Sequence, residues 1–422
     1  MIARLLADPT IKRALGRADP VRLLKQAIAV QQIPAPTFAE ANRAAYVAAQ
    51  FISAGLADVE TDDIGNVYGR LPSAGLRAPV LVTAHTDTVF PPDTDLAIRR
   101  EAGRVYGPGL GDNALGVAAL MELPALLQSA DVELPGDLWL VANVGEEGLG
   151  DLRGMRRAVD RLGETVGATI VLEGLAFGRI YNSGIGVRRY CVRASAAGGH
   201  SWMHFGQPSA VHGLVQLGSA LTELQTPAAP RTTFNIGKIS GGTSVNTIAR
   251  TAELELDLRS EDDAILAKLA RKVETTIAAV EERSKVKFKF EICGNRPSGQ
   301  IPTEHPLVQL AVATLQHVGH AEPQLERGST DANIPLSRGL PAVTVGLTSG
   351  GNTHRPDEYI EVGLLQDGLR HIFLLVAGAF SISPELRSSL VEPRAERETK
   401  RSPKGAYRDQ ELRQNGLRYG VS

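Results

Sequence analysis

The chain has 422 residues, of which 43% are hydrophobic and 22% are charged, and its formal net charge is -2 at pH 7. This length exceeds one ordinary domain, and the composition is that of a globular protein with a sizeable core. The nearly balanced charge gives no electrostatic reason to expect nucleic acid or an anionic membrane as a partner. Two distant cysteines, Cys191 and Cys293, exclude a framework of several disulfides and are typical of a reducing compartment.

Neither end of the chain predicts a membrane segment. The amino-terminal residues alternate in charge and lack the continuous apolar region of a signal peptide. The apolar stretch HIFLLVAGAF near the other end is too short to span a bilayer. We therefore expect a cytoplasmic protein that has no membrane partner.

Short apolar runs and helical patterns alternate along the first part of the chain. Residues 21–56 predict helices on either side of the turn QQIPAPTFAE, where two prolines interrupt the pattern. The elements that follow are the strands VYGRL and APVLVTAHTDTV, the helix GDNALGVAALMELPALLQSA, the strand DLWLVANV, the helix DLRGMRRAVDRL and the strand ATIVLEG. Apolar strands between helices predict an α/β fold with a mostly parallel sheet that is covered on both faces.

The order then changes to strand, helix, strand, strand, helix and strand, which is the split βαβ order of a small ferredoxin-like α+β module. The first pattern resumes afterwards with the helix HPLVQLAVATLQHVG, the strand LPAVTVGL and a final helix. We therefore expect one domain, made of residues 1–186 and 298–384, that is interrupted by an inserted domain of residues 187–297. Residues 385–422 are charged and poor in apolar residues, which predicts a disordered tail.

Acidic and histidine residues follow four strands of the first pattern. They are His85 and Asp87 after VLVTA, Glu146 and Glu147 after LWLVANV, Glu173 after TIVL, and His354 beyond PAVTVGL. Ligand crevices of open α/β sheets lie beyond the carboxyl ends of the strands, so these groups are expected to meet in one place. Two adjacent glutamates taken alone are more often part of a solvated loop.

Asp112 ends the glycine-rich loop GRVYGPGLGD and directly precedes a helix. Since Asp is a favoured helix N-cap, a capping role is an equally good interpretation of this residue taken alone. A dinucleotide-binding loop is disfavoured, because the glycines miss the G-x-G-x-x-G spacing.

Five of these residues together match the requirements of two divalent cations. They are His85, Asp112, Glu147, Glu173 and His354. Three carboxylates and a bridging hydroxide balance four positive charges. If Asp112 bridges, each cation has one histidine, two carboxylates and a solvent oxygen, a set that suits zinc. Glu146 is then free to act as the general base, and Asp87 can orient the imidazole of His85.

The motifs HTDTV, GPGLGDNALG, GEEGLG, VLEG and GGNTHRPDE occur in this order along the chain. They resemble those of the dizinc exopeptidase family that includes peptidase T, carboxypeptidase G, acetylornithine deacetylase and succinyl-diaminopimelate desuccinylase. The resemblance implies that His85 and Glu173 hold one zinc ion. Glu147 and His354 would hold the other, and Asp112 would bridge the two. Glu173 stands where some members have Asp, which leaves the subgroup open.

The resemblance also implies that the inserted domain is a lid through which the protein forms a homodimer. His200 in AAGGHSW matches the lid histidine that approaches the scissile carbonyl, often from the partner subunit. Asn246 in GGTSVNTIA and Arg259 in LDLRS match lid positions associated with substrate. An exposed surface position is the alternative interpretation of His200 and of Arg259.

The loop RGSTDAN lies just before the last strand of the first pattern and contains Ser329 and Asp331. In the family this loop faces the substrate, so both residues are expected to contact it. The alternative is a helix start that is capped by Ser329 or Thr330.

Together these residues predict a metallohydrolase that cleaves the amide bond of a short peptide with two Zn2+ ions per subunit, Co2+ and Mn2+ being alternatives. The stretches HTDTVFP, GSTDAN and THRPDEYIE resemble peptidase T-like members, which favours a tripeptide-type aminopeptidase. A carboxypeptidase or an N-acyl-amino-acid deacylase would use the same metal centre. A non-catalytic peptide-binding relative is the alternative from another class, although it should have lost a ligand or the base.

Overall fold

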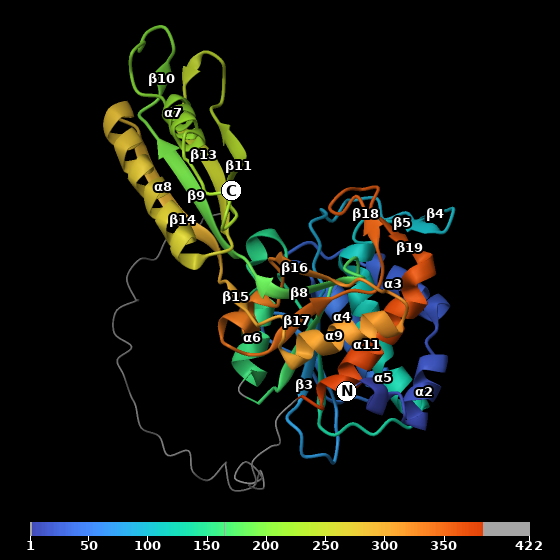
Figure 1. Ribbon diagram of the computed structural model, residues 1–422. Coiled ribbons are helices and arrows are strands. Elements are labelled where there is room, and N and C mark those ends of the chain that lie inside the picture. Colours follow the sequence, from blue (N-terminus) through green and yellow to red (C-terminus); the bar gives the residue numbers. More distant parts are fainter. Residues whose placement is uncertain (1, 164, 383–422) are drawn as a thin grey trace, which may run out of the picture. The chain divides into compact units, whose positions relative to one another are not determined.

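In the computed structural model (Figure 1), residues 2–163 and 165–382 are described. Their buried apolar side chains form two separate clusters, one of which lies entirely within residues 187–297. The described residues nevertheless belong to one compact unit. The division into domains of residues 1–186 plus 298–384 and 187–297 therefore stays a prediction. The predicted disordered tail, residues 385–422, lies outside the described residues.

A sheet of nine strands runs through the larger cluster. Its order is β1 (Ala57–Thr61), β2 (Val67–Leu71), β6 (Leu138–Asn143), β3 (Val80–His85), β7 (Ala168–Leu172), β17 (Ala342–Val345), β8 (Arg179–Gly184) and β15 (Gly299–Gln300), and β16 (Gln324–Gly328) pairs with β8. The central strands β6, β3, β7 and β17 are parallel. Each residue of β3, β7 and β17 is buried, as expected for strands covered on both faces.

The α/β class is confirmed, but the sheet is mixed rather than mostly parallel. The pairs β1–β2, β2–β6, β17–β8 and β8–β15 are antiparallel. A parallel connection needs a crossover of a dozen or more residues. The chain passes from β1 to β2 and from β7 to β8 through short loops, which leave no room for such a crossover.

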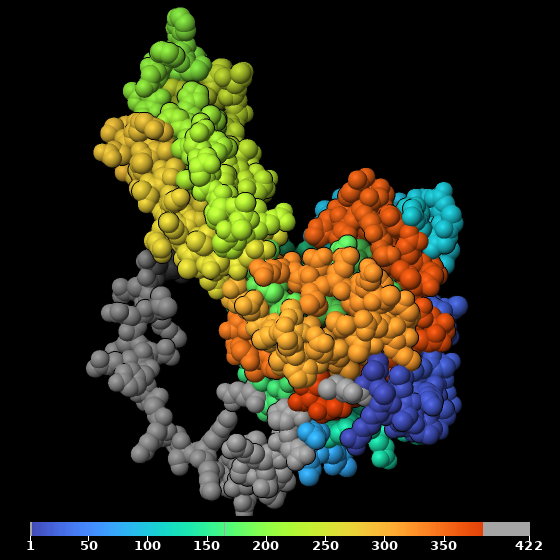
Figure 2. Space-filling model, in the orientation of Figure 1, coloured from blue at the N-terminus to red at the C-terminus, as the bar shows by residue number. Residues whose placement is uncertain are grey.

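Helices pack around this sheet largely as the sequence predicts. They are α1 (Ile2–Leu5), α2 (Pro9–Gly16), α3 (Pro20–Gln31), α4 (Ala41–Ser53), α5 (Leu115–Ser129), α6 (Arg153–Leu162), α9 (Pro306–His317), α10 (Asn333–Ser337) and α11 (Leu365–Ala379). Helix α5 contacts β3, β6 and β7, whereas α9 contacts β17 and β8. Side chains of α9 and its flanking segments, coloured orange, cover much of the face shown in Figure 2.

Two of the core segments are long and apolar enough, by length and composition, to cross a membrane. They are Leu110–Ser129 and Val362–Ala379, and 89% and 67% of the residues in their apolar 18-residue windows are buried within the protein. The stretch HIFLLVAGAF, which by itself is too short for a bilayer, lies inside the second segment except for its last residue, Phe380. Burial of this extent is typical of core helices, so these segments are weak evidence for a membrane span.

Residues 187–297 form most of an antiparallel four-stranded sheet. Its order is β11 (Thr232–Gly241), β13 (Thr251–Ser260), β9 (Gly186–Ser195) and β14 (Lys287–Arg296), and it packs against α7 (Ala210–Thr222) and α8 (Asp263–Ser284). Every second residue of β13 is buried, so one face of the sheet meets the helices. The elements follow the predicted split βαβ order. A separate pair, β10 (Gly199–His200) and β12 (Thr247–Ile248), lies in the same segment.

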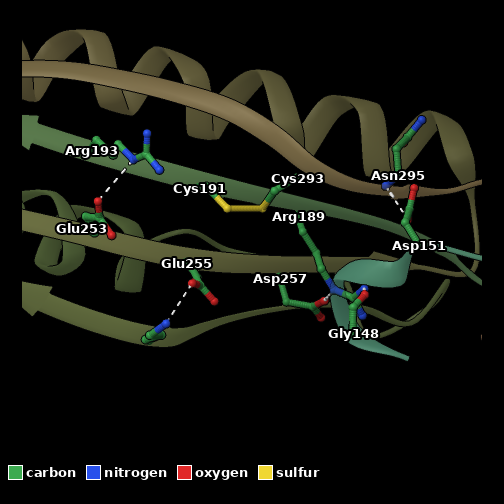
Figure 3. The surroundings of a disulfide bond; sticks show 11 residues. Gly148, Asp151, Arg189, Cys191, Arg193, Glu253, Glu255, Asp257, Cys293 and Asn295 are labelled. Atoms are coloured by element: carbon green, nitrogen blue, oxygen red, sulfur yellow. Dashed lines mark hydrogen bonds and ion pairs between the residues drawn. A yellow bond between two sulfur atoms is a disulfide. The ribbon is translucent and has the colours of Figure 1, made fainter. Parts of the chain in front are cut away.

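Cys191 on β9 and Cys293 on β14 form a disulfide (Figure 3). The two strands pair antiparallel with Glu291 opposite Cys191, and Cys293 is the extra residue at an irregularity between Ile292 and Gly294. The sequence indicated no such pair, because the two cysteines are 102 residues apart. Disulfides are rare in reducing compartments, so the cysteines no longer support a cytoplasmic location. That location stays a prediction.

Candidate metal centre

Three neighbouring parallel strands deliver the predicted site residues to one edge of the large sheet. Strand β3 ends at His85, β6 ends just before Glu146 and Glu147, and β7 ends just before Glu173. His85 pairs in register with Asn143 at the end of β6. Because parallel strands end on the same side, these side chains meet although the chain between them is long.

A small sheet brings two further residues to the same edge. Its order is β18 (Gly350–Gly351), β19 (Tyr359–Glu361), β5 (Arg104–Tyr106) and β4 (Arg99–Glu101). Asp112 follows β5, and His354 lies in the loop between β18 and β19. The pairing of β5 with β19 therefore places the two loops side by side, although Asp112 and His354 are 242 residues apart.

Asp112 lies between the two histidines, and each of its oxygens faces one imidazole. Asp112 Oδ1 is 3.1 Å from His85 Nε2, and Asp112 Oδ2 is 3.1 Å from His354 Nε2. The N-cap of α5 is Ala114, and it makes no side-chain capping bond. Asp112 therefore does not cap that helix, which decides against the alternative interpretation of this residue.

Each histidine also has a carboxylate of its own. Glu173 Oε2 is 3.5 Å from His85 Nε2, and Glu147 Oε1 is 3.1 Å from His354 Nε2. Two groups result, in which ligand atoms lie within 4.8 Å of one another and could hold a metal ion. They are His85, Asp112 and Glu173, and Asp112, Glu147 and His354. The structure thus brings the five predicted ligands together, with Asp112 common to both groups.

The electrostatics of this cluster favour positive charge. Burial lowers the pKa of His85, but Glu173, Asp112 and Asp87 raise it more strongly, well above its usual value. Hydrogen bonds with Asp112 and Glu147 raise the pKa of His354 to about 10. Burial raises the pKa of Glu173 to about 8. The cluster has more buried carboxylates than histidines, so it favours the binding of protons or cations. Its mixed N and O donor set fits divalent metal ions.

Asp87 does more than the sequence predicts. His85 Nδ1 lies 3.1 Å from the carbonyl oxygen of Asp87 and 3.5 Å from its Oδ1. The Asp87 carboxylate also accepts the backbone N–H groups of Glu146 and Glu147, each at 3.0 Å. A single buried aspartate therefore holds both the imidazole and the loop that presents the two glutamates. No sequence signal indicates this second contact.

Glu358 is a residue of the site that the sequence analysis did not assign. It is completely buried, and its Oε1 accepts the backbone N–H groups of Gly111 at 2.8 Å and Asp112 at 3.1 Å. Burial and the neighbouring Asp112 raise the pKa of Glu358 to about 7. Glu358 thereby anchors the glycine-rich loop that carries Asp112. Its position in the motif GGNTHRPDE was the only available signal.

Glu146 and Glu147 differ in their partners. Glu147 contacts His354, whereas Glu146 Oε1 accepts a hydrogen bond of 2.9 Å from Arg296 Nη1. Glu146 also offers a carboxylate oxygen within 4.8 Å of ligand atoms of His85 and Glu147. Arg296 is the second residue that sequence reasoning missed, because it ends β14 of the smaller sheet, whose strands were not expected to reach this edge.

A cavity of about 690 Å³ opens over the cluster. Arg259 and Ser329, two of the predicted substrate-binding residues, line it. The arginines in its wall are Arg179, Arg189, Arg259, Arg296 and Arg327. Among the described residues, the acidic side chains that line it are Asp112, Glu146, Glu147 and Glu173. A strongly cationic wall therefore faces the acidic cluster.

Residues 81–377 match the family model described as Peptidase family M20/M25/M40. The chain belongs to this peptidase family. The matched segment makes up more than half of the chain and contains all five residues of the cluster. Chains of this family are metal-dependent hydrolases that act on peptides or acylated amino acids, so the chain is a hydrolase of that class.

Two relatives are similar over most of the chain. The protein YqjE of Bacillus subtilis is 25% identical over 344 residues, which are 77% of this chain and 90% of that protein. Acetylornithine deacetylase of Shigella sonnei is 25% identical over 331 residues, which are 71% of this chain and 80% of the enzyme.

Solved structures of family members share the fold. Aminopeptidase PepT of Bacillus cereus superposes with a TM-score of 0.67 at 19% identity, covering 86% of this chain and 99% of that one. A tripeptidase of Staphylococcus aureus gives a TM-score of 0.72 at 21% identity, with the same coverage. The di-peptidase Dug1p of Saccharomyces cerevisiae gives 0.73 at 14% identity, covering 89% and 99%.

Three predicted residues of this hydrolase do not reach the cavity of their own chain. His200 lies on β10, and the N–H of the next residue donates to the carbonyl oxygen of Asn246 at 3.0 Å. These two residues are therefore neighbours, but neither lines the cavity. Against the prediction, Asp331 is completely buried and accepts a 2.7 Å hydrogen bond from Asn143 Nδ2. Burial raises the pKa of Asp331 to about 7.

Proposed function

We propose that the chain is a dinuclear metallopeptidase of the tripeptide-type aminopeptidase class. The observation that supports this most strongly is Asp112 between two histidines, each of which has its own carboxylate. The fold shared with an aminopeptidase and a tripeptidase is in accord with it.

The donor set fits two Zn2+ ions, with Co2+ and Mn2+ as alternatives. His85 and Glu173 would hold one ion, Glu147 and His354 the other, and Asp112 would contact both. Bound there, the two ions would act as Lewis acids that activate water and polarise the scissile carbonyl.

The residues around the ions then share the proton transfers and the orientation of the substrate. Glu146 accepts the proton of the attacking water and delivers it to the leaving amine nitrogen. Asp87 keeps the ring of His85 in its orientation. Arg259 and Ser329 in the cavity wall bind the substrate. The guanidinium group of Arg259 pairs with a carboxylate of the substrate.

The proposed subunit arrangement is a homodimer formed through residues 187–297. His200 and Asn246 are neighbours that do not line the cavity of their own chain. In a dimer, they would enter the site of the partner subunit, where the imidazole of His200 would donate to the developing oxyanion. The cytoplasm is the proposed location.

The cavity wall favours a second candidate, a carboxypeptidase or N-acyl-amino-acid deacylase. An aminopeptidase must bind a free α-ammonium group, which calls for a carboxylate outside the metal cluster. Among the described residues, every acidic side chain that lines the cavity belongs to the cluster or is the base, whereas five arginines face it. Arginines pair with substrate carboxylates, which both a tripeptide and an N-acyl amino acid possess.

The experiment is an assay of the purified protein on four substrates, with and without a chelator. Tri-alanine has both termini free, tri-alanine amide only the amino terminus, and N-acetyl-tri-alanine and a hippuryl amino acid only the carboxyl terminus. An aminopeptidase cleaves the first two, a carboxypeptidase cleaves the first and the last two, and a deacylase cleaves the last two. Tri-alanine amide therefore separates an aminopeptidase from the other two enzymes. A chelator should abolish turnover, and added Zn2+ should restore it. Turnover that is indifferent to the chelator refutes the metal mechanism, and metal-loaded protein without turnover supports the non-catalytic peptide-binding alternative.

A further inference from the structure

Arg296 is the last residue of β14, and its side chain is only 5% exposed. Its Nη1 donates to Glu146 Oε1 at 2.9 Å and to Ser329 Oγ at 3.1 Å. Its Nη2 donates to the backbone carbonyl oxygen of Glu146. One planar guanidinium therefore grips both the side chain and the backbone of the same residue, which fixes the direction of that side chain.

The contact with Arg296 occupies one of the two carboxylate oxygens of Glu146 and leaves the other free to accept a proton. Oε1 is bonded to Arg296, whereas no described residue donates a hydrogen bond to Oε2, and Glu146 lines the cavity. The Glu146 side chain is itself only 9% exposed and forms an ion pair with Arg296 inside the protein. A carboxylate oxygen of Glu146 already lies within 4.8 Å of ligand atoms of His85 and Glu147, so a small rotation of a side chain freed from Arg296 would let it join the metal ligands.

We propose that Arg296 is a positioning residue that keeps Glu146 out of the ligand set and directs its free oxygen to the substrate side of the metal centre. This inference rests on the proposed function, in which Glu146 is the base. It explains how two adjacent and chemically identical side chains take different tasks. His354 engages Glu147, and Arg296 engages Glu146.

Other contacts hold the same loop without touching either glutamate side chain (Figure 3). The N–H of Asn295 donates to Asp151 Oδ1 at 2.8 Å, and Arg189 Nη1 donates to the carbonyl oxygen of Gly148. Arg156 Nη2 donates to the carbonyl oxygen of Asn295 at 2.6 Å. Removal of Arg296 should therefore leave the loop attached to β14. Arg156 offers a matched control, because it joins the same segments but lies outside the cavity.

The test compares Arg296→Met with Arg156→Met in protein loaded with Co2+. Arg296→Met should lower kcat about 100-fold, because displacement of a catalytic group by about 1 Å has an effect of this size. KM for a substrate whose carboxyl group is blocked should stay within about twofold. The visible absorption spectrum of Co2+ should change as Glu146 enters the ligand set, while metal content stays at two ions per chain. Arg156→Met should change neither kcat nor the spectrum.

An unchanged kcat and an unchanged Co2+ spectrum in Arg296→Met would overturn the proposal. A higher KM that is confined to substrates with a free carboxylate also overturns it, because Arg296 would then be a substrate-binding residue. If Arg296→Met does not fold, Arg296→Lys carries the test, since one ammonium group cannot span both Oε1 and the backbone carbonyl oxygen of Glu146. It should lower kcat about tenfold with the same spectral change. Full activity of Glu146→Gln would instead refute the proposed function.

Discussion

The nine-stranded sheet and the four-stranded sheet of β11, β13, β9 and β14 differ in how far their charged side chains are buried. At the edge of the nine-stranded sheet, His85 and Glu146 are 1% and 7% exposed and depend on partners inside the protein. On the four-stranded sheet, Arg193 and Glu253 pair across β9 and β13 with side chains 67% and 61% exposed (Figure 3). Buried charges are costly unless they are paired, whereas exposed pairs contribute little to stability. Both sheets carry charged residues. What distinguishes the site is that its charged side chains are buried.

The largest effect expected from this comparison follows from Glu146→Gln. The amide cannot accept a proton, so kcat should fall by roughly 10²- to 10⁴-fold, while the shape of the side chain is kept. Steady-state kinetics measure the loss, and elemental analysis should still find two metal ions per chain. Loss of both ions would mean that Glu146, rather than Glu147, is the metal ligand.

The second effect tests whether the two hydrophobic clusters are independent. Leu256 on β13 is 2% exposed in the smaller cluster, so Leu256→Ala should lower the free energy of unfolding by about 2–5 kcal/mol. Because this cluster contains no side chain of the metal centre, metal content should not change. Urea unfolding and elemental analysis are the measurements. Ile239→Ala on the neighbouring strand is the control, since Ile239 is 53% exposed and should cost about 0.5 kcal/mol or less. Loss of metal in Leu256→Ala would contradict independence.

The third effect concerns a buried histidine that has no carboxylate partner among the described residues. His371 Nδ1 lies 2.9 Å from Thr314 Oγ1, and burial lowers the pKa of His371 to about 3. Above pH 3, His371 stays neutral in the folded state. In the unfolded state it binds a proton once the pH falls below its ordinary pKa of 6.5. Stability should therefore fall as the pH drops from 6.5 toward 3, by about 2 kcal/mol between pH 6.5 and 5.

His371→Gln retains a polar side chain and removes the titration. The difference in unfolding free energy between pH 6.5 and 5 should therefore be about 2 kcal/mol smaller in the variant, as measured with urea. Equal pH dependence in both proteins would show that His371 is protonated in the folded state. This test sharpens the contrast with His354, whose pKa is raised to about 10 by its carboxylate partners.

The smallest effect is expected on the exposed face of the four-stranded sheet. Arg193 Nε lies 3.2 Å from Glu253 Oε1 in a solvated cross-strand pair. Removal of either side chain, or of both, should change the unfolding free energy by less than about 1 kcal/mol, with a coupling energy in the same range. A double-mutant cycle measures that coupling. A coupling energy above about 2 kcal/mol would contradict the comparison, because an exposed ion pair would then stabilise the protein as strongly as a buried one.

Much of the metal centre could be predicted because its residues follow strands. His85, Glu147 and Glu173 come just after apolar runs, and parallel strands carry whatever follows them to one edge of the sheet. Their spacing along the chain is therefore irrelevant to their meeting. The same logic did not extend to Arg296 or Glu358, whose partners lie 150 and 247 residues away.

The sequence by itself determined the α/β class, the order of the elements and the group of acids and histidines that gathers at one end of the strands. Only the tertiary structure decided which of two adjacent glutamates meets His354 and which meets Arg296. It also decided that Asp331 turns into the core and that Cys191 and Cys293 meet. Hydrophobic periodicity is a local property that can be recognised in the sequence alone. A contact between distant side chains depends instead on strand order, register and local irregularities. Those features arise only when the separate elements pack together.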